Sequence, residues 1–238
     1  MKKVVITTAL LVGLLAFLLP AQATIITWDL NYEFSEAYQP AGAAPWLRAT
    51  FEDVGSGIVE LTMKAENLTD AEFISEWYFN LDPDFDPAGL RFNYVGGQFP
   101  RYEIGEVAFA TGIDFKNIAG GGWFDIGFFF PTSNKPAPPQ YDRFGAVEVS
   151  VWDITFEVDD SPLELFNAEW FNFPSTPSGD NGTYLTAAHV QGIGGNDENS
   201  GWIAPSDSVS VPEPSTMLLL GVGLIGLAGI GRKKFVKK

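Results

Sequence analysis

The sequence predicts an all-β fold, an antiparallel β-sandwich of the jelly-roll type, for the part of the chain between its two ends. Several short runs are rich in Val, Ile, Phe, Tyr and Trp and alternate, at least partly, between apolar and polar residues. Clusters of Gly, Pro, Asn and Asp separate these runs. No long stretch between the two ends shows the 3.6-residue period of an amphipathic helix. Short strands with turn residues between them are typical of antiparallel sandwiches.

The N-terminal end has the three parts of a secretory signal peptide. Two lysines near the start precede an apolar run over residues 4–19. A proline ends this run, and Ala21 and Ala23 then form a small-x-small cleavage site. We therefore expect residues 1–23 to be a signal helix that is removed, so that the mature chain starts at Thr24.

The strands expected between the ends differ in how clearly they alternate. Residues 58–65 place Val, Leu, Met and Ala opposite Ile, Glu, Thr and Lys, which is a partial alternation. In residues 147–158 one face turns from apolar to polar while the other does the reverse, which indicates a bulge or a change of sheet. The runs that we expect to form strands are 25–34, 47–54, 58–65, 73–81, 90–95, 123–130, 147–158 and 163–173.

One acidic loop is a candidate calcium site. Asp82, Asp84 and Asp86 stand at alternate positions, and Ca²⁺ prefers six to eight oxygen ligands, of which this spacing can supply three. The loop departs from the EF-hand pattern, because Pro87 stands where the turn glycine belongs and Asn93 where the bidentate glutamate belongs. The alternative is a solvated acidic loop held rigid by its prolines, and we expect no other cofactor.

Candidate catalytic residues are few, and we expect no enzymatic activity. His189 is the only histidine and the chain has no cysteine, which excludes thiol nucleophiles, thiolate metal sites and multi-histidine zinc sites. The neighbours of His189 favour a packed histidine in a strand or turn. A secreted hydrolase built on His189 or on a carboxylate pair remains an alternative, although so acidic a chain always contains some pair at a suitable distance.

Seven tryptophans could support a different function, that of a calcium-assisted carbohydrate-binding module. Aromatic rings stack on sugars, but most large aromatic residues in a β domain without disulfides form the core. We expect one or two exposed at most. The seven are Trp28, Trp46, Trp77, Trp123, Trp152, Trp170 and Trp202.

The C-terminal end contains a proline motif, an apolar run and a basic tail in that order. Pro212, Glu213 and Pro214 precede an uncharged run over residues 217–230, and five basic residues follow it. The run has 14 residues, whereas a stable membrane helix needs about 20. Even so, we expect it to form a single transmembrane helix, which suits a segment that an enzyme removes, and the alternative is a plain membrane anchor.

This end resembles the PEP-CTERM sorting signal of bacterial exported proteins. The resemblance implies that exosortase, a membrane protease or transpeptidase, recognises Pro212, Glu213 and Pro214 and cuts near them. It implies a destination at the cell surface or in an exopolysaccharide matrix. Residues 73–83, 184–194 and 200–203 also look like segments shared by many such proteins, which implies a common extracellular β domain without an established activity.

The domain organisation and the charge agree with export. We expect a β-sandwich over residues 24–203, a linker over 204–211 and the sorting signal over 212–238. Basic residues lie at the outer sides of both apolar runs, which leaves both ends in the cytoplasm and the middle outside.

Residues 24–211 contain seven basic and 29 acidic residues, a net charge of −22. Such a charge repels nucleic acid, which we therefore exclude as a partner.

Overall fold

The computed structural model describes residues 23–69, 71–99, 109–133, 142–159, 161–195 and 198–206. The chain divides into two compact units between Ser206 and Asp207, and the second unit lies wholly outside the described residues. The apolar runs over residues 4–19 and 217–230, where the signal helix and the transmembrane helix are expected, also lie outside them. Within the described ranges, no helix has the length and apolar character needed to cross a membrane.

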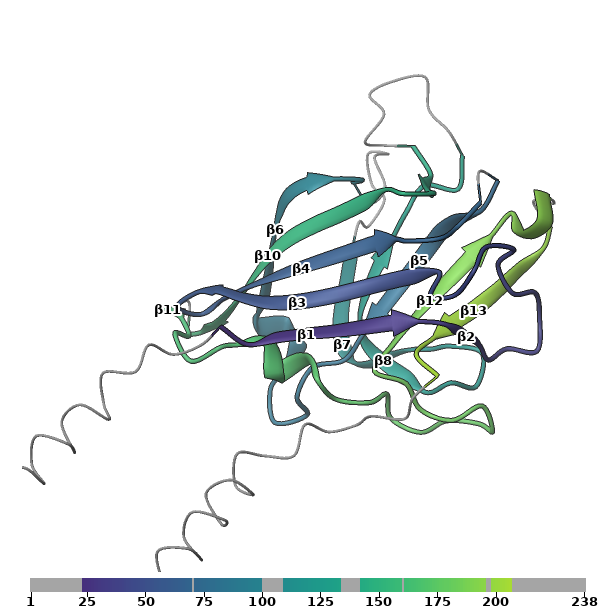
Figure 1. Ribbon diagram of the computed structural model, residues 1–238. Coiled ribbons are helices and arrows are strands. Elements are labelled where there is room, and N and C mark those ends of the chain that lie inside the picture. Colours follow the sequence, from purple (N-terminus) through teal and green to yellow (C-terminus); the bar gives the residue numbers. More distant parts are fainter. Residues whose placement is uncertain are drawn as a thin grey trace, which may run out of the picture. The chain divides into compact units, whose positions relative to one another are not determined.

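The first unit consists of two antiparallel sheets that lie against each other (Figure 1). In sheet 1, β10 pairs with β4 along one edge and with β6 along the other. The end of β10 also pairs with the short strand β11. The strands of sheet 1 are β1 (Ile25–Leu30), β3 (Leu47–Gly55), β4 (Ile58–Ala65), β10 (Val149–Val158), β6 (Leu90–Gly97) and β11 (Ser161–Pro162).

Sheet 2 has β5 near its centre, between β12 and β8. Its strands are β2 (Tyr32–Glu33), β13 (Ser200–Ala204), β12 (Thr186–Gln191), β5 (Phe73–Phe79), β8 (Trp123–Phe129), β7 (Phe109–Asn117) and β9 (Phe144–Gly145). Short 3-10 turns complete the unit: η1 (Pro87–Gly89), η3 (Ala168–Phe171) and η4 (Ile193–Gly195). The all-β, two-sheet prediction is confirmed, and the finer jelly-roll connectivity stays a prediction.

The core between the sheets follows from the alternation of the strands. In β4 every second residue from Val59 to Ala65 is buried, as the sequence pattern predicts. Phe51 of β3 lies at the centre and is fully buried. Its ring contacts Phe79 of β5 at 5.3 Å between centroids and Phe171 of η3 at 4.2 Å. Aromatic side chains from both sheets and from η3 therefore form the core.

The turn between β3 and β4 requires a glycine. Gly57 has a φ of +67°, in the left-handed region, and a Cβ atom there would lie 2.6 Å from the carbonyl oxygen of Leu163. The glycine allows the segment after β11 to pack closely against this hairpin.

Two details of the strand prediction need correction. The expected strand over residues 163–173 is wrong, because Asn167 caps the 3-10 turn η3 by accepting a hydrogen bond from the Glu169 N–H at 3.0 Å. The irregularity expected within residues 147–158 is absent from β10, in which every second residue from Ser150 to Phe156 is buried, and the extra residue lies instead in the partner strand β6. Val151 and Trp152 of β10 face Gly96 and Tyr94, so Val95 is the bulge.

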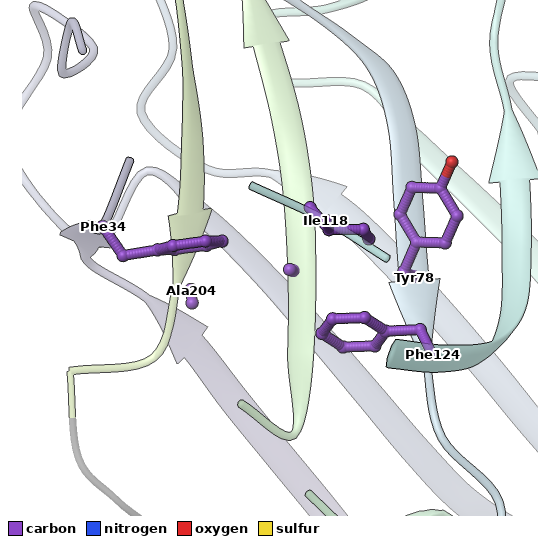
Figure 2. Close-up of a cluster of buried hydrophobic side chains, with 6 residues drawn as sticks. Phe34, Tyr78, Ile118, Phe124 and Ala204 are labelled. Atoms are coloured by element: carbon purple, nitrogen blue, oxygen red, sulfur yellow. The ribbon is translucent and has the colours of Figure 1, made fainter. Parts of the chain in front are cut away.

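The outer faces of the two sheets differ in character. Tyr78 points away from sheet 1, because its neighbours Trp77 and Phe79 point into the core. Figure 2 shows the second apolar cluster that forms around Tyr78 on this outer face of sheet 2. The outer face of sheet 1 instead carries ion pairs, such as Arg48 with Asp29 at 2.7 Å. The buried members of the second cluster are Phe34, Tyr78, Ile118, Phe124, Ala187 and Ala204.

Candidate binding pocket and sorting motif

A pocket with a volume of about 360 Å³ lies where β5 ends, next to the acidic loop that follows it. Its walls come from four segments far apart in the sequence: the end of β5 with the loop after it, the bulged part of β7, β8, and the segment after η3. This volume is within the range of small-ligand sites in proteins. The lining residues that matter for its chemistry are Asn80, Phe85, Asp114, Asp125, Phe173 and Pro177.

Two carboxylates provide the polar part of the pocket. Asp125 of β8 is half-buried, and its oxygens accept hydrogen bonds from the N–H groups of Leu81 at 3.1 Å and Asp114 at 2.9 Å. Burial raises the pKa of Asp125 above its ordinary value, and the nearby charge of Asp114 adds to the rise, whereas the two N–H donors oppose it. The carboxylate is therefore fixed in orientation and has lone pairs left for a ligand.

Aromatic rings provide the apolar part. Phe85 lines the pocket and stacks on Trp170, with centroids 3.5 Å apart and planes 16° apart. The N–H of Asp82 donates to the Trp170 carbonyl oxygen at 2.7 Å, which ties the loop to η3. Trp123 pairs through its backbone with the lining residue Thr176 and is 38% exposed. It is the one exposed tryptophan in the described part of the chain, which agrees with the expectation of one or two exposed tryptophans at most.

The predicted calcium ligands lie in the loop beside this pocket. Asp82 accepts the N–H of Asp84 at 2.9 Å, and Asp86 accepts the N–H of Ala88 at 3.0 Å, where it caps η1. Both carboxylates thus stabilise local turns. Among the described residues, no three Asp, Glu or His side chains form a group that could hold a metal ion. The structure does not gather these carboxylates around one point, and calcium binding here stays a prediction.

His189 lies in β12, against the buried residue Ser75 of β5. The two side chains are 3.1 Å apart, and the Ser75 hydroxyl also donates to the His189 carbonyl oxygen at 3.3 Å. Burial lowers the pKa of His189, and the charge of Glu76 opposes this shift. Because Ser75 is only 2% exposed, it is not placed to attack a substrate. The geometry fits the packed histidine that the sequence indicates.

The pair of Asp114 and Asp125 was missed by sequence reasoning. Asp125 stands alone in the aromatic run of β8, and an isolated carboxylate in such a run is the one signal that could have singled it out. Asp114 has a φ of +48° and lies in the stretch of β7 between Thr111 and Lys116 where the register with β8 shifts. No periodicity in the sequence predicts that shift.

The predicted processing sites fall mostly outside the described part of the chain. Of the signal-cleavage residues, Ala23 and Thr24 are described and Ala21 is not. Pro212, Glu213 and Pro214 of the sorting motif also lie outside it.

Comparison with known proteins identifies the C-terminal end only. The family model described as the PEP-CTERM protein-sorting motif matches residues 210–233. No curated protein and no solved structure matches the chain. The match covers the residues that the sequence indicated, from just before Pro212 into the basic tail, and it implies an exported protein that exosortase processes in association with the membrane. The chain therefore carries a PEP-CTERM protein-sorting motif over residues 210–233.

Proposed function

We propose that this chain is a non-enzymatic protein of the cell surface or the exopolysaccharide matrix. Export removes residues 1–23, and the C-terminal apolar run over residues 217–230 holds the β-sandwich at the membrane for a time. Exosortase then cuts near Pro212–Pro214 and releases the sandwich or transfers it to a surface acceptor. The observation that carries the proposal is the sorting motif over residues 210–233. In this chemistry the chain is the substrate, so its functional residues at this end are recognition residues.

The physical character of the sandwich supports the destination. The exported part has a net charge of −22, which favours solubility outside the cell and repels anionic surfaces. It has no disulfide and relies on its aromatic core for stability. The serine that His189 contacts is buried.

The experiment that tests the proposal replaces both prolines of the motif. In the native host, the double variant Pro212→Ala, Pro214→Ala should keep its C-terminal tail, because the extended backbone that the prolines impose is lost. The matched control is Pro205→Ala, which lies outside the matched residues and should mature normally. Normal maturation of the double variant would show that the motif is not the recognition element.

A second candidate function, carbohydrate binding, is supported by the pocket. A sugar ring has apolar C–H faces that pack on aromatic rings and hydroxyl groups that donate to carboxylates. Phe85 offers the first kind of contact and Asp125 the second, at one cavity. The acidic charge of the exported part favours neutral or amino-bearing polysaccharides over anionic ones.

Affinity electrophoresis in gels that contain neutral, amino-bearing or anionic polysaccharides tests this second function. Retardation by one of the first two should be lost in Phe85→Ala and in Asp125→Asn. It should persist in Asp153→Asn, a change on the outer face of sheet 1. Retardation that a chelator abolishes would favour the calcium-assisted form. Mobility unchanged in every gel, or equal retardation of all variants, would argue against a sugar site in this pocket.

A further inference from the structure

The first residue expected in the mature chain lies against a carboxylate. The backbone N–H of Thr24 donates to Oδ2 of Asp53 at 3.1 Å. In return, the N–H of Asp53 donates to the carbonyl oxygen of Thr24 at 2.9 Å. Ile25, the next residue, is in register with Glu52 of β3. Thr24 therefore extends the pairing of β1 and β3 by one residue, and its nitrogen is held at a fixed place.

The Asp53 carboxylate also accepts a second hydrogen bond, through its other oxygen. Oδ1 of Asp53 accepts the N–H of Ala168 at 2.7 Å, at the start of η3. Ala168 is fully buried, and η3 supplies Phe171 to the core. Asp53 thus joins the start of β1 to η3. Its side chain is already oriented toward the Thr24 nitrogen.

Cleavage by signal peptidase changes the charge of that nitrogen. Water adds across the peptide bond between Ala23 and Thr24, which leaves a carboxylate on Ala23 and an amine on Thr24. An α-amino group has an ordinary pKa of about 7.7–8.0, so it takes up a proton near neutral pH and becomes an ammonium. The neutral N–H donor that faces Asp53 before cleavage is replaced by a cation.

We propose that removal of the signal peptide creates an ion pair between the new α-ammonium of Thr24 and the carboxylate of Asp53, and that this pair fixes the mature N-terminus to β3 and η3. The inference rests on cleavage directly before Thr24 and is independent of the sorting function. Each extra residue would carry the ammonium about 3.3–3.6 Å along the chain, beyond contact with Asp53. The pair thus makes the stability of the sandwich depend on the position of the cut.

A double-mutant cycle on the exported full chain tests the pair. In the first variant, Gly-Ser is inserted between Ala23 and Thr24, so that the mature chain keeps two extra residues and the Thr24 nitrogen is again an amide. Exposed ion pairs change the folding equilibrium by about 1.4- to 5-fold. We expect the insertion to lower the ratio of folded to unfolded protein by about this factor in urea unfolding. In the Asp53→Asn background the insertion should have almost no effect.

The control background is Asp29→Asn, which removes another carboxylate of sheet 1 and leaves Asp53 intact. There the insertion should keep its full effect. An insertion effect of equal size in the Asp53→Asn and wild-type backgrounds, or none in the wild type, would overturn the proposal. Intact mass must first show a start at Thr24, and a different start would also overturn it while leaving the sorting function untouched.

A second measurement does not depend on the folding of Asp53→Asn. An ammonium held by a carboxylate releases its proton less readily, so its amine should react more slowly with an acylating reagent near pH 8. The Thr24 amine should therefore label more slowly in the folded wild type than in the same chain unfolded in urea, where Asp53 no longer lies against it. Equal labelling rates would contradict the ion pair.

Discussion

The imidazole of His189 stacks on the indole of Trp202, with ring centroids 4.6 Å apart and planes 16° apart. These residues face each other across β12 and β13. On its other side His189 contacts the buried Ser75. The one side chain of this sequence that ordinarily changes charge near pH 6.5 is thus partly buried between an aromatic ring and a buried serine.

Partial burial of the imidazole predicts a lowered pKa for His189. Because His189 is the only histidine, its ring protons give a single histidine titration in proton NMR. The midpoint should lie below the ordinary value of about 6.5, because burial disfavours the imidazolium. A midpoint at or above 6.5 would show that Glu76 outweighs burial.

The same shift predicts a dependence of stability on pH. The unfolded chain binds the proton of His189 more tightly than the folded chain, so this residue destabilises the fold as the pH falls below about 6.5. In His189→Gln the free energy of unfolding, measured in urea, should fall less steeply over this window. Identical slopes in the variant and the wild type would contradict the assignment.

The raised pKa of Asp125 predicts a dependence of stability on pH that is opposite in sign to that of His189. The raised pKa means that the folded state binds the proton more tightly, so the contribution to stability is present at low pH and is lost as the pH rises through the raised value. Asp125→Asn should lack this slope. It should also be less stable than the wild type at pH 7 by about 1–3 kcal/mol, because Leu81 and Asp114 donate to different oxygens of Asp125, and asparagine has an NH2 group in place of one of them.

The control for this prediction is Asp153→Asn, on the outer face of sheet 1. Urea unfolding between pH 3.5 and 7 should give this variant the wild-type slope. An unchanged slope in Asp125→Asn would show that Asp125 is not shifted in the folded protein.

Of the substitutions described here, Phe51→Ala should lower the free energy of unfolding the most. Phe51 is fully buried and contacts aromatic rings from sheet 2 and from η3, so Phe51→Ala leaves a cavity between both layers. Such changes cost about 3–5 kcal/mol. Thr50→Ala, its neighbour on the outer face, should cost far less. A loss below about 1 kcal/mol in Phe51→Ala, measured by denaturant unfolding, would contradict the central place of this ring in the core.

The strands found from the sequence either have two faces that differ, as β4 does, or are rich in aromatic residues, as β5 is although it is buried on both faces. β4 alternates between Val59, Leu61, Met63 and Ala65 on the core face and polar residues on the other, because one face of sheet 1 meets solvent. β12 was missed because the start of this strand, from Thr186 to Ala188, is buried on both sides of sheet 2 and shows no alternation. A strand that is buried on both faces does not alternate between apolar and polar residues, so alternation cannot identify it in the sequence.

The aromatic run over residues 163–173 misled the prediction for a different reason. Phe166 and Phe171 are buried as strand residues would be, but Phe166 lies in a turn closed by its N–H donating to the Leu163 carbonyl oxygen, and Phe171 lies in the 3-10 turn that Asn167 caps. The candidate pocket could not be predicted either, because Asp114 and Asp125 meet only through the register shift of β7. By contrast, the sorting motif depends on the order of three local features and was therefore readable from the sequence alone.

The intact mass of the protein recovered from the surface and medium of its native host tests the central claim most directly. The account predicts a mass that corresponds to a start at Thr24 and an end between residues 211 and 214, with any excess reporting an attached surface group. A mass that still includes residues 217–238 would mean that the tail is a permanent anchor and would contradict sorting by exosortase.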